Sequence, residues 1–135
     1  MSAFWLQVRV YLEDTDAQGV VYNASYFRFM ERARTDWLRE REVDHRACEQ
    51  QYGMIFVLTN IEAQFVAPGR LGDQLFVSAE VSELKGARAV FMQQIRRGDS
   101  QGELLAQGQA VVACIDKESG RPRRWPGEVL ERLGQ

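Results

Sequence analysis

The sequence has few of the residues that build disulfides, zinc sites or imidazole-based catalysis. Its 135 residues include two cysteines and one histidine. Cys48 and Cys114 are too few and too far apart for a disulfide framework or a zinc knuckle, and His45 has no second imidazole at ligand spacing. We therefore predict reduced cysteines and no metal site. A Ser-His-Asp or Cys-His arrangement is excluded unless His45 takes part in it.

Long apolar runs are also missing. The first six residues have neither a basic region nor a long apolar stretch, and no later segment is apolar for long enough to span a membrane. The net charge of -2 gives no electrostatic reason to expect nucleic acid as a partner. These absences predict a cytoplasmic protein without a transmembrane segment, and the length suits a single domain, residues 1–135.

The N-terminal part of the sequence predicts a strand followed by a long helix. Apolar side chains alternate with polar ones from Leu6 to Leu12, as in a strand with one buried face. In the range Ala24–Arg41, large apolar residues recur at steps of three and four and nearly encircle the predicted helix, which indicates that it is buried. A second, shorter helix is predicted over Asp44–Gln51, with Gly53 as the glycine that ends it.

The rest of the chain predicts four more strands and a short terminal helix. Turn residues such as Pro68-Gly69 and Lys85-Gly86 separate the strands, and short turns join antiparallel neighbours. Pro126 precedes the terminal helix. The predicted strands are Met54–Phe65, Gln74–Leu84, Ala87–Arg97 and Glu103–Asp116, and the predicted terminal helix is Glu128–Leu133. The fold class is α+β, with a five-stranded, mainly antiparallel sheet wrapped around one long central helix.

The junction Glu13–Tyr26, between the first strand and the long helix, is the candidate active site. Asp14 and Asp16 lie where the strand is expected to end, and Asn23 is a suitable N-cap for the helix. The first N–H groups of a helix have no intrahelical partner and carry the positive end of its dipole. An oxyanion could be held there while Asp16 acts from the other side. We expect Asp14 to cap or orient the loop.

Two structural alternatives apply to the same residues. An Asp-x-Asp-x-x-Gly cluster is also typical of a solvated turn. A calcium-binding EF-hand loop begins in a similar way, but Ser25 stands where its last glutamate ligand belongs. The calcium reading is therefore excluded, whereas the plain turn stays open.

The runs Val8–Tyr26, Glu31–Thr35 and Phe65–Asp73 resemble the bacterial acyl-CoA thioesterases of the hotdog fold. The resemblance covers nearly the whole chain, and it is to the subfamily encoded beside the Tol-Pal envelope genes and related to 4-hydroxybenzoyl-CoA thioesterase. It implies a hotdog fold, an acyl-CoA substrate and Asp16 as the catalytic nucleophile or general base. The backbone N–H of Asn23 is then expected to polarise the thioester carbonyl. The subfamily commonly has histidine at the position of Asn23.

The same resemblance implies the cofactors and partners. Coenzyme A would be part of the substrate, so no cofactor is expected, and acyl carrier protein is an alternative carrier of the acyl group. The resemblance further implies a homo-oligomer, a tetramer built as a dimer of dimers, with active sites at subunit boundaries. Two other functions stay open. One is a non-catalytic module that binds acyl-CoA or an acylated carrier protein, and the other is a hydratase or dehydratase of the same fold.

Two basic groups are candidates for binding the phosphates of coenzyme A. One is Lys85 with Arg88, and the other is the basic run 121–124; either group could instead be a solvated surface. On the long helix, Glu31 is spaced to form an ion pair with Arg28 or Arg34.

Overall fold

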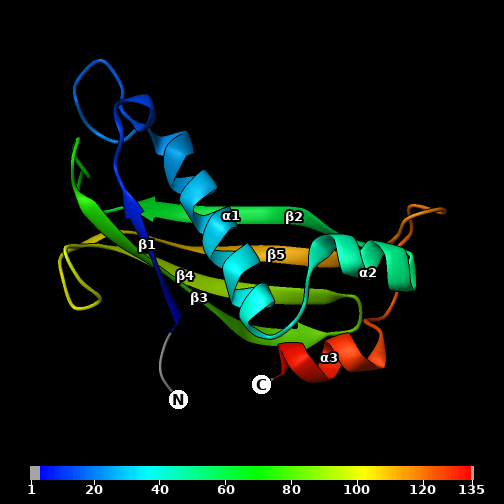
Figure 1. The fold of residues 1–135 in the computed structure, drawn as a ribbon. Coiled ribbons are helices and arrows are strands. Elements are labelled where there is room, and N and C mark those ends of the chain that lie inside the picture. Colours follow the sequence, from blue (N-terminus) through cyan, green and yellow to red (C-terminus); the bar gives the residue numbers. More distant parts are fainter. Residues whose placement is uncertain (1–3, 135) are drawn as a thin grey trace.

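The computed structural model describes residues 4–134, in which five strands form one antiparallel sheet with the order β1-β3-β4-β5-β2 (Figure 1). The strands are β1 (Phe4–Arg9), β2 (Met54–Phe65), β3 (Gln74–Lys85), β4 (Arg88–Arg97) and β5 (Leu104–Asp116). The helices are α1 (Asn23–Glu40), α2 (His45–Tyr52) and α3 (Gly127–Leu133). The predicted α+β class and the five-stranded antiparallel sheet are confirmed.

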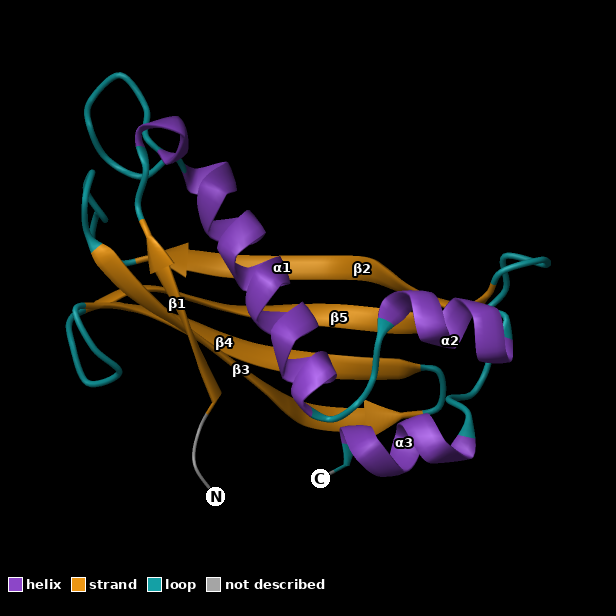
Figure 2. Cartoon of the chain, in the orientation of Figure 1, coloured by secondary structure: helices purple, strands orange, loops and turns teal. Residues whose placement is uncertain are grey.

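Helix α1 crosses one face of the sheet, and α2 lies beside the C-terminal end of α1 (Figure 2). The apolar side of α1 supplies Phe29, Met30, Ala33 and Trp37 to the core, all at most 3% exposed. The indole of Trp37 packs edge-on against the ring of Phe91 on β4, with 5.3 Å between ring centroids. The three predicted helices are all present. Wrapping of the sheet around α1 as one long central helix stays a prediction.

Most predicted bounds differ from the observed ones by a residue or two, but the first strand ends earlier than expected. β1 stops at Arg9, and Leu12–Asp14 forms a 3₁₀ turn instead of continuing the strand. The reason is local: the buried carboxylate of Asp14 accepts a hydrogen bond from the Tyr11 N–H, which is therefore lost to the sheet. Leu12, the last member of the apolar alternation, is 74% exposed.

The start of α1 is a second correction. Asn23 is the first residue of the helix, and its N-cap is Tyr22, which has extended backbone angles and forms no side-chain capping bond. By contrast, Gly53 ends α2 with a left-handed φ of 65°, as predicted.

Some predictions fall on the chain ends. Residues 1–3 and 135 lie outside the described range, so the single domain over residues 1–135 and the nature of the first residues stay predictions. Among the described residues, no helix is both long enough and apolar enough to cross a membrane.

Candidate active site

The loop between β1 and α1 is a tight hydrogen-bonded turn around Asp16. Thr15 and Val21 form an antiparallel bridge, and the Asp16 N–H donates to the Val20 carbonyl (2.9 Å). The Gly19 N–H donates back to the Asp16 carbonyl (3.0 Å). Gly19 has a φ of 79°, a conformation that side chains with a Cβ disfavour. The backbone thus fixes the position of Asp16 without using its carboxylate.

Asp14 and Asp16 have different surroundings. The Asp14 side chain is 6% exposed, and its Oδ2 accepts the Tyr11 N–H (2.8 Å). Its backbone carbonyl accepts the Tyr22 N–H (2.9 Å), immediately before α1. The prediction that Asp14 orients the loop is therefore confirmed. Asp16 is exposed, and its Oδ1 accepts one hydrogen bond, from the Gln18 N–H (2.8 Å). Within residues 4–134, its Oδ2 has no hydrogen-bond partner.

The first turn of α1 presents a free donor beside this loop. Tyr22 supplies no side-chain cap, and among the described residues the Asn23 N–H has no acceptor. This donor lies at the positive end of the helix dipole, and Asn23 is an exposed residue. Of the two residues predicted to be catalytic, Asp16 lies in the loop between β1 and α1, and Asn23 is the first residue of α1; this loop lies at one end of the molecule (Figure 1).

A second loop, residues 68–73 between β2 and β3, braces the first. The Val21 N–H donates to the Gly69 carbonyl (2.8 Å), and the Gly69 N–H donates to the Tyr26 hydroxyl (2.9 Å). A Cβ on Gly69 would lie 3.0 Å from the Val21 Cγ2 and 3.2 Å from the Tyr26 hydroxyl, so the close approach depends on glycine. Burial, as the main cause, raises the pKa of the Tyr26 phenol, which therefore stays neutral.

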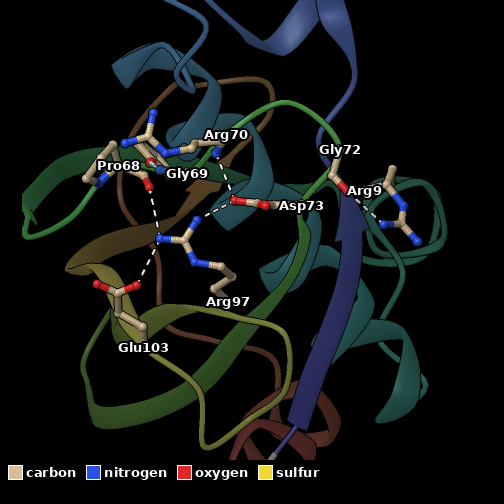
Figure 3. Close-up of polar contacts among 9 residues, drawn as sticks. Arg9, Pro68, Gly69, Arg70, Gly72, Asp73, Arg97 and Glu103 are labelled. Atoms are coloured by element: carbon tan, nitrogen blue, oxygen red, sulfur yellow. Dashed lines mark hydrogen bonds and ion pairs between the residues drawn. The ribbon is translucent and has the colours of Figure 1, made fainter.

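Arg97 on β4 ties the bracing loop to the sheet, as Figure 3 shows. Its guanidinium pairs with the carboxylate of Asp73 and with Glu103 Oε1 (2.9 Å), and it donates to the Pro68 carbonyl (3.2 Å). Asp73 in turn accepts the Arg70 N–H (2.8 Å). The hydrogen bonds to Glu103 and Asp73 raise the pKa of Arg97, so its side chain is charged. This cation holds both ends of the loop, because it contacts Pro68 at one end and Asp73 at the other.

This bracing was not predictable from the sequence. Pro68-Gly69 was interpretable as turn chemistry, but its contact with Val21 depends on the order of the strands. Tyr26 occupies a helical position typical of a core residue, and it is indeed 2% exposed. Arg97 looks like any charged strand end. Only the long-range pairing reveals that these residues support the loop that carries Asp16.

The proposed coenzyme A-binding residues are not close to Asp16 within one chain. Lys85 and Arg88 flank the β3–β4 turn, at the opposite end of the sheet from the Asp16 loop (Figure 1). The length of β3 alone separates these ends by about 36 Å. Arg88 forms an ion pair with Glu83 (3.0 Å), and both side chains are about half exposed. The second basic run follows β5 at the same far end, where Arg123 donates to the Tyr52 carbonyl (2.7 Å).

The remaining reactive side chains lie elsewhere. Cys48 and Cys114 are buried free thiols, and burial raises the pKa of Cys114 to about 11. His45 is exposed, as predicted, and its ring packs against Phe56 with 4.8 Å between centroids. No group of three or more His, Cys, Asp or Glu side chains in residues 4–134 is placed to hold a metal ion.

The predicted ion pair of Glu31 is wrong, because its carboxylate accepts from the Thr35 hydroxyl (3.3 Å) instead.

Comparisons with known proteins show similarity to thioesterases in sequence and in fold. A family model described as the thioesterase-like superfamily matches residues 10–133. The acyl-CoA thioester hydrolase YbgC of Escherichia coli is 38% identical over 134 residues, which are 99% of this chain and 98% of that protein. The structure of a probable thioesterase from Bartonella henselae superposes with a TM-score of 0.84 at 34% identity, covering 93% of this chain and 100% of that one. A 1,4-dihydroxy-2-naphthoyl-CoA thioesterase from Synechocystis shares the fold, with a TM-score of 0.89 at 24% identity and coverage of 99% and 97%.

Proposed function

The chain belongs to the thioesterase-like hotdog superfamily and is a thioester hydrolase, and from that premise we propose that Asp16 and the backbone N–H of Asn23 hydrolyse an acyl-CoA. The products would be the free acid and coenzyme A. The observation that carries the assignment is the pairing of an exposed carboxylate with a free helix-terminal donor on one braced loop.

The chemistry follows from these two groups. The thioester carbonyl oxygen would accept the Asn23 N–H, which stabilises the oxyanion that forms when the carbonyl is attacked. Asp16 either attacks the carbonyl carbon directly or takes a proton from an attacking water molecule. In both routes the C–S bond breaks and the coenzyme A thiolate leaves. Direct attack gives an acyl anhydride on Asp16, which water then cleaves to restore the carboxylate.

The backbone donor makes the identity of the Asn23 side chain secondary. Any residue other than proline supplies an N–H at the first position of the helix. We therefore propose that asparagine serves here in place of the histidine common in the subfamily, because the donor used is the main-chain one.

Binding of the coenzyme A phosphates by Lys85 and Arg88 requires a second copy of the chain. β2 is an edge strand of 12 residues, and within the described chain it pairs only on its β5 side. Two copies paired through β2 about a two-fold axis would run antiparallel. The β3–β4 turn of one copy would then lie at the same end as the Asp16 loop of the other. We propose this dimer as the unit of function, and two such dimers as the tetramer.

The experiment compares Asp16→Asn with Asp14→Asn as the matched control. Release of free thiol is followed with aliphatic and aromatic acyl-CoA esters, and with an acyl carrier protein thioester. Asp16→Asn is expected to lower kcat by about 10²–10⁴-fold with little loss of thermal stability, because its side chain is exposed. Asp14→Asn is expected to lose stability but less activity, because its carboxylate is buried and hydrogen-bonded.

Four outcomes would contradict the assignment. Near-normal turnover by Asp16→Asn, or a larger catalytic loss in Asp14→Asn, would remove Asp16 from the mechanism. Tight ester binding without any hydrolysis by the unmodified protein would favour a non-catalytic binding module. Addition of water to an enoyl-CoA without thiol release would favour a hydratase.

A further inference from the structure

Arg34, in the middle of α1, is a buried cation without an anionic partner among the described residues. It is 6% exposed, and its Nη1 donates to the Gln93 Oε1 (2.9 Å). Both N–H groups of the Gln93 amide already have acceptors, because its Nε2 donates to the carbonyls of Met30 (2.9 Å) and Ser78 (3.1 Å). No carboxylate in residues 4–134 lies within 4.0 Å of the Arg34 guanidinium.

Burying the charge of Arg34 destabilises the folded protein unless an anionic group binds the guanidinium. A guanidinium has five N–H donors, and the Arg34 donor with a partner here is bound by a neutral side chain. Among the described residues, no other Arg34 nitrogen is a fully buried atom without a partner, so the remaining donors reach the cavity or solvent. Burial, as the main cause, lowers the pKa of Arg34, and the negative charge of Glu31 opposes this effect. An arginine remains charged under these conditions, so a buried charge lacks a counter-ion.

The guanidinium borders a cavity of about 120 Å³ between α1 and the sheet. Its exposed rim carries Glu31 and His45, and Thr35 adds a hydroxyl group to its lining. The other lining residues besides Arg34 are apolar: Leu38, Phe56, Leu58, Phe91 and Val112. Since one water molecule occupies about 30 Å³ of liquid, the space suits a carboxylate with a few carbon atoms. A cation on the wall of an apolar cavity is suited to a ligand that is hydrocarbon with an anionic end.

The cavity lies on the same side of α1 as residues close to its start. Phe27 packs against Phe65 of β2, with 6.1 Å between ring centroids. Phe27 and Arg34 are two helical turns apart, so they project from the same side of α1. From Asn23 to Arg34 the helix axis advances roughly 16 Å. An acyl chain bound at the Asn23 N–H and following this side of the helix would therefore reach the cavity with its far end.

We propose that Arg34 binds a carboxylate at the far end of the acyl chain, so that the substrates are coenzyme A esters of medium-chain dicarboxylic acids. The inference rests on the proposed thioesterase function and names its substrate class. Glu31 lies at the exposed rim, where its carboxylate accepts from the Thr35 hydroxyl (3.3 Å) and forms no ion pair with Arg34 within residues 4–134. Arg34 acts on specificity and takes no part in breaking the thioester.

The test compares dodecanoyl-CoA with dodecanedioyl-CoA, which differ only in the terminal carboxylate. The unmodified protein is expected to show a kcat/KM at least about tenfold higher for the dicarboxylic ester. Arg34→Met, which keeps the length of the side chain and removes its charge, should abolish this preference. Arg39→Met is the control, since Arg39 is a 64% exposed cation on the same helix, paired with Asp44 at the surface. It should leave the preference unchanged.

A second measurement uses only the unmodified protein, in case Arg34→Met does not fold. Dodecanedioate should inhibit hydrolysis at lower concentration than dodecanoate. The proposal is overturned by equal inhibition, by equal kcat/KM for the two esters, or by a preference that survives in Arg34→Met. It is also overturned if Arg34→Met alters the assembly mass but not the preference, because an acid of another copy would then be the partner. Hydrolysis of neither ester, nor of any other, would instead refute the proposed function.

Discussion

Replacing Tyr26 with phenylalanine removes one hydrogen bond and thereby tests the bracing of the Asp16 loop by residues 68–73. The Tyr26 hydroxyl accepts the N–H of Gly69, and both residues are buried. Phenylalanine keeps the ring and its contacts, including the edge-on contact with Phe29 at 6.4 Å between centroids, so packing changes little. The substitution therefore removes an acceptor and leaves a buried N–H without a partner.

The expected cost follows from that unpaired group. A buried donor left without an acceptor costs about 1–3 kcal/mol in the free energy of unfolding. For a chain of this length, each kcal/mol lowers Tm by about 3–5 °C. Tyr26→Phe should also lower kcat, because Gly69 holds Val21 and thereby the loop that carries Asp16.

The measurement combines thermal unfolding with thiol-release kinetics, and Tyr52→Phe is the control. The Tyr52 hydroxyl donates to Glu128 (2.6 Å) at an exposed position far from the Asp16 loop, so losing that bond should cost about 0.5–1 kcal/mol and leave kcat unchanged. Tyr26→Phe with the stability of the unmodified protein would refute the reasoning, since the Gly69 N–H would then have another acceptor. A stability loss equal to that of Tyr52→Phe would also refute it.

Two further predictions concern charge and thiol chemistry. Arg97→Gln should lower the free energy of unfolding by about 1–3 kcal/mol and reduce kcat, because it loosens residues 68–73. The control is Arg96→Gln, which should leave kcat unchanged because the hydrogen bonds of the Arg96 side chain stay within its own hairpin. Thermal unfolding and turnover are measured for both variants, and equal losses of kcat would contradict the bracing role. Burial raises the pKa of Cys114 from 9.0 to about 11, so this thiol should resist iodoacetamide at pH 8 until the protein is unfolded. The contribution of the buried thiol to stability should be lost as pH rises from about 9 to 11, because the unfolded chain then releases the proton first. Rapid labelling of the native protein would contradict this prediction.

The sequence predicted the regular elements well because their signals are local. β2 was predicted over Met54–Phe65, its observed bounds, because Gly53 and Pro68-Gly69 mark the breaks on either side. The first strand was predicted too long because Leu12 continues the apolar alternation, whereas the Asp14 carboxylate competes for a backbone donor. Asn23 has the side chain of an N-cap, but the chain turns into the helix one residue earlier.

The candidate site was predictable only as far as it is continuous in sequence. Asp16 and Asn23 lie on one segment, and their proximity follows from it. Gly69 and Arg97 come from distant elements, and their roles depend on which strands are neighbours. The cavity beside Arg34 was likewise invisible, because the sequence suggested a surface ion pair for a side chain that the fold buries against Gln93.

Because residues 68–73 brace the Asp16 loop, the loop can reach its folded geometry only after those residues have been synthesised. β3, β4 and β5 are consecutive in the chain and joined by short turns, so their pairing closes small loops and can form early. The Asp16 loop leaves the ribosome long before Gly69, the residue that accepts its Val21 N–H. A nascent chain would therefore carry Asp16 and Asn23, the proposed catalytic residues, for some time before the loop has its folded geometry. The ability to cleave thioesters would arise only once the middle of the polypeptide has been synthesised and folded back onto its beginning.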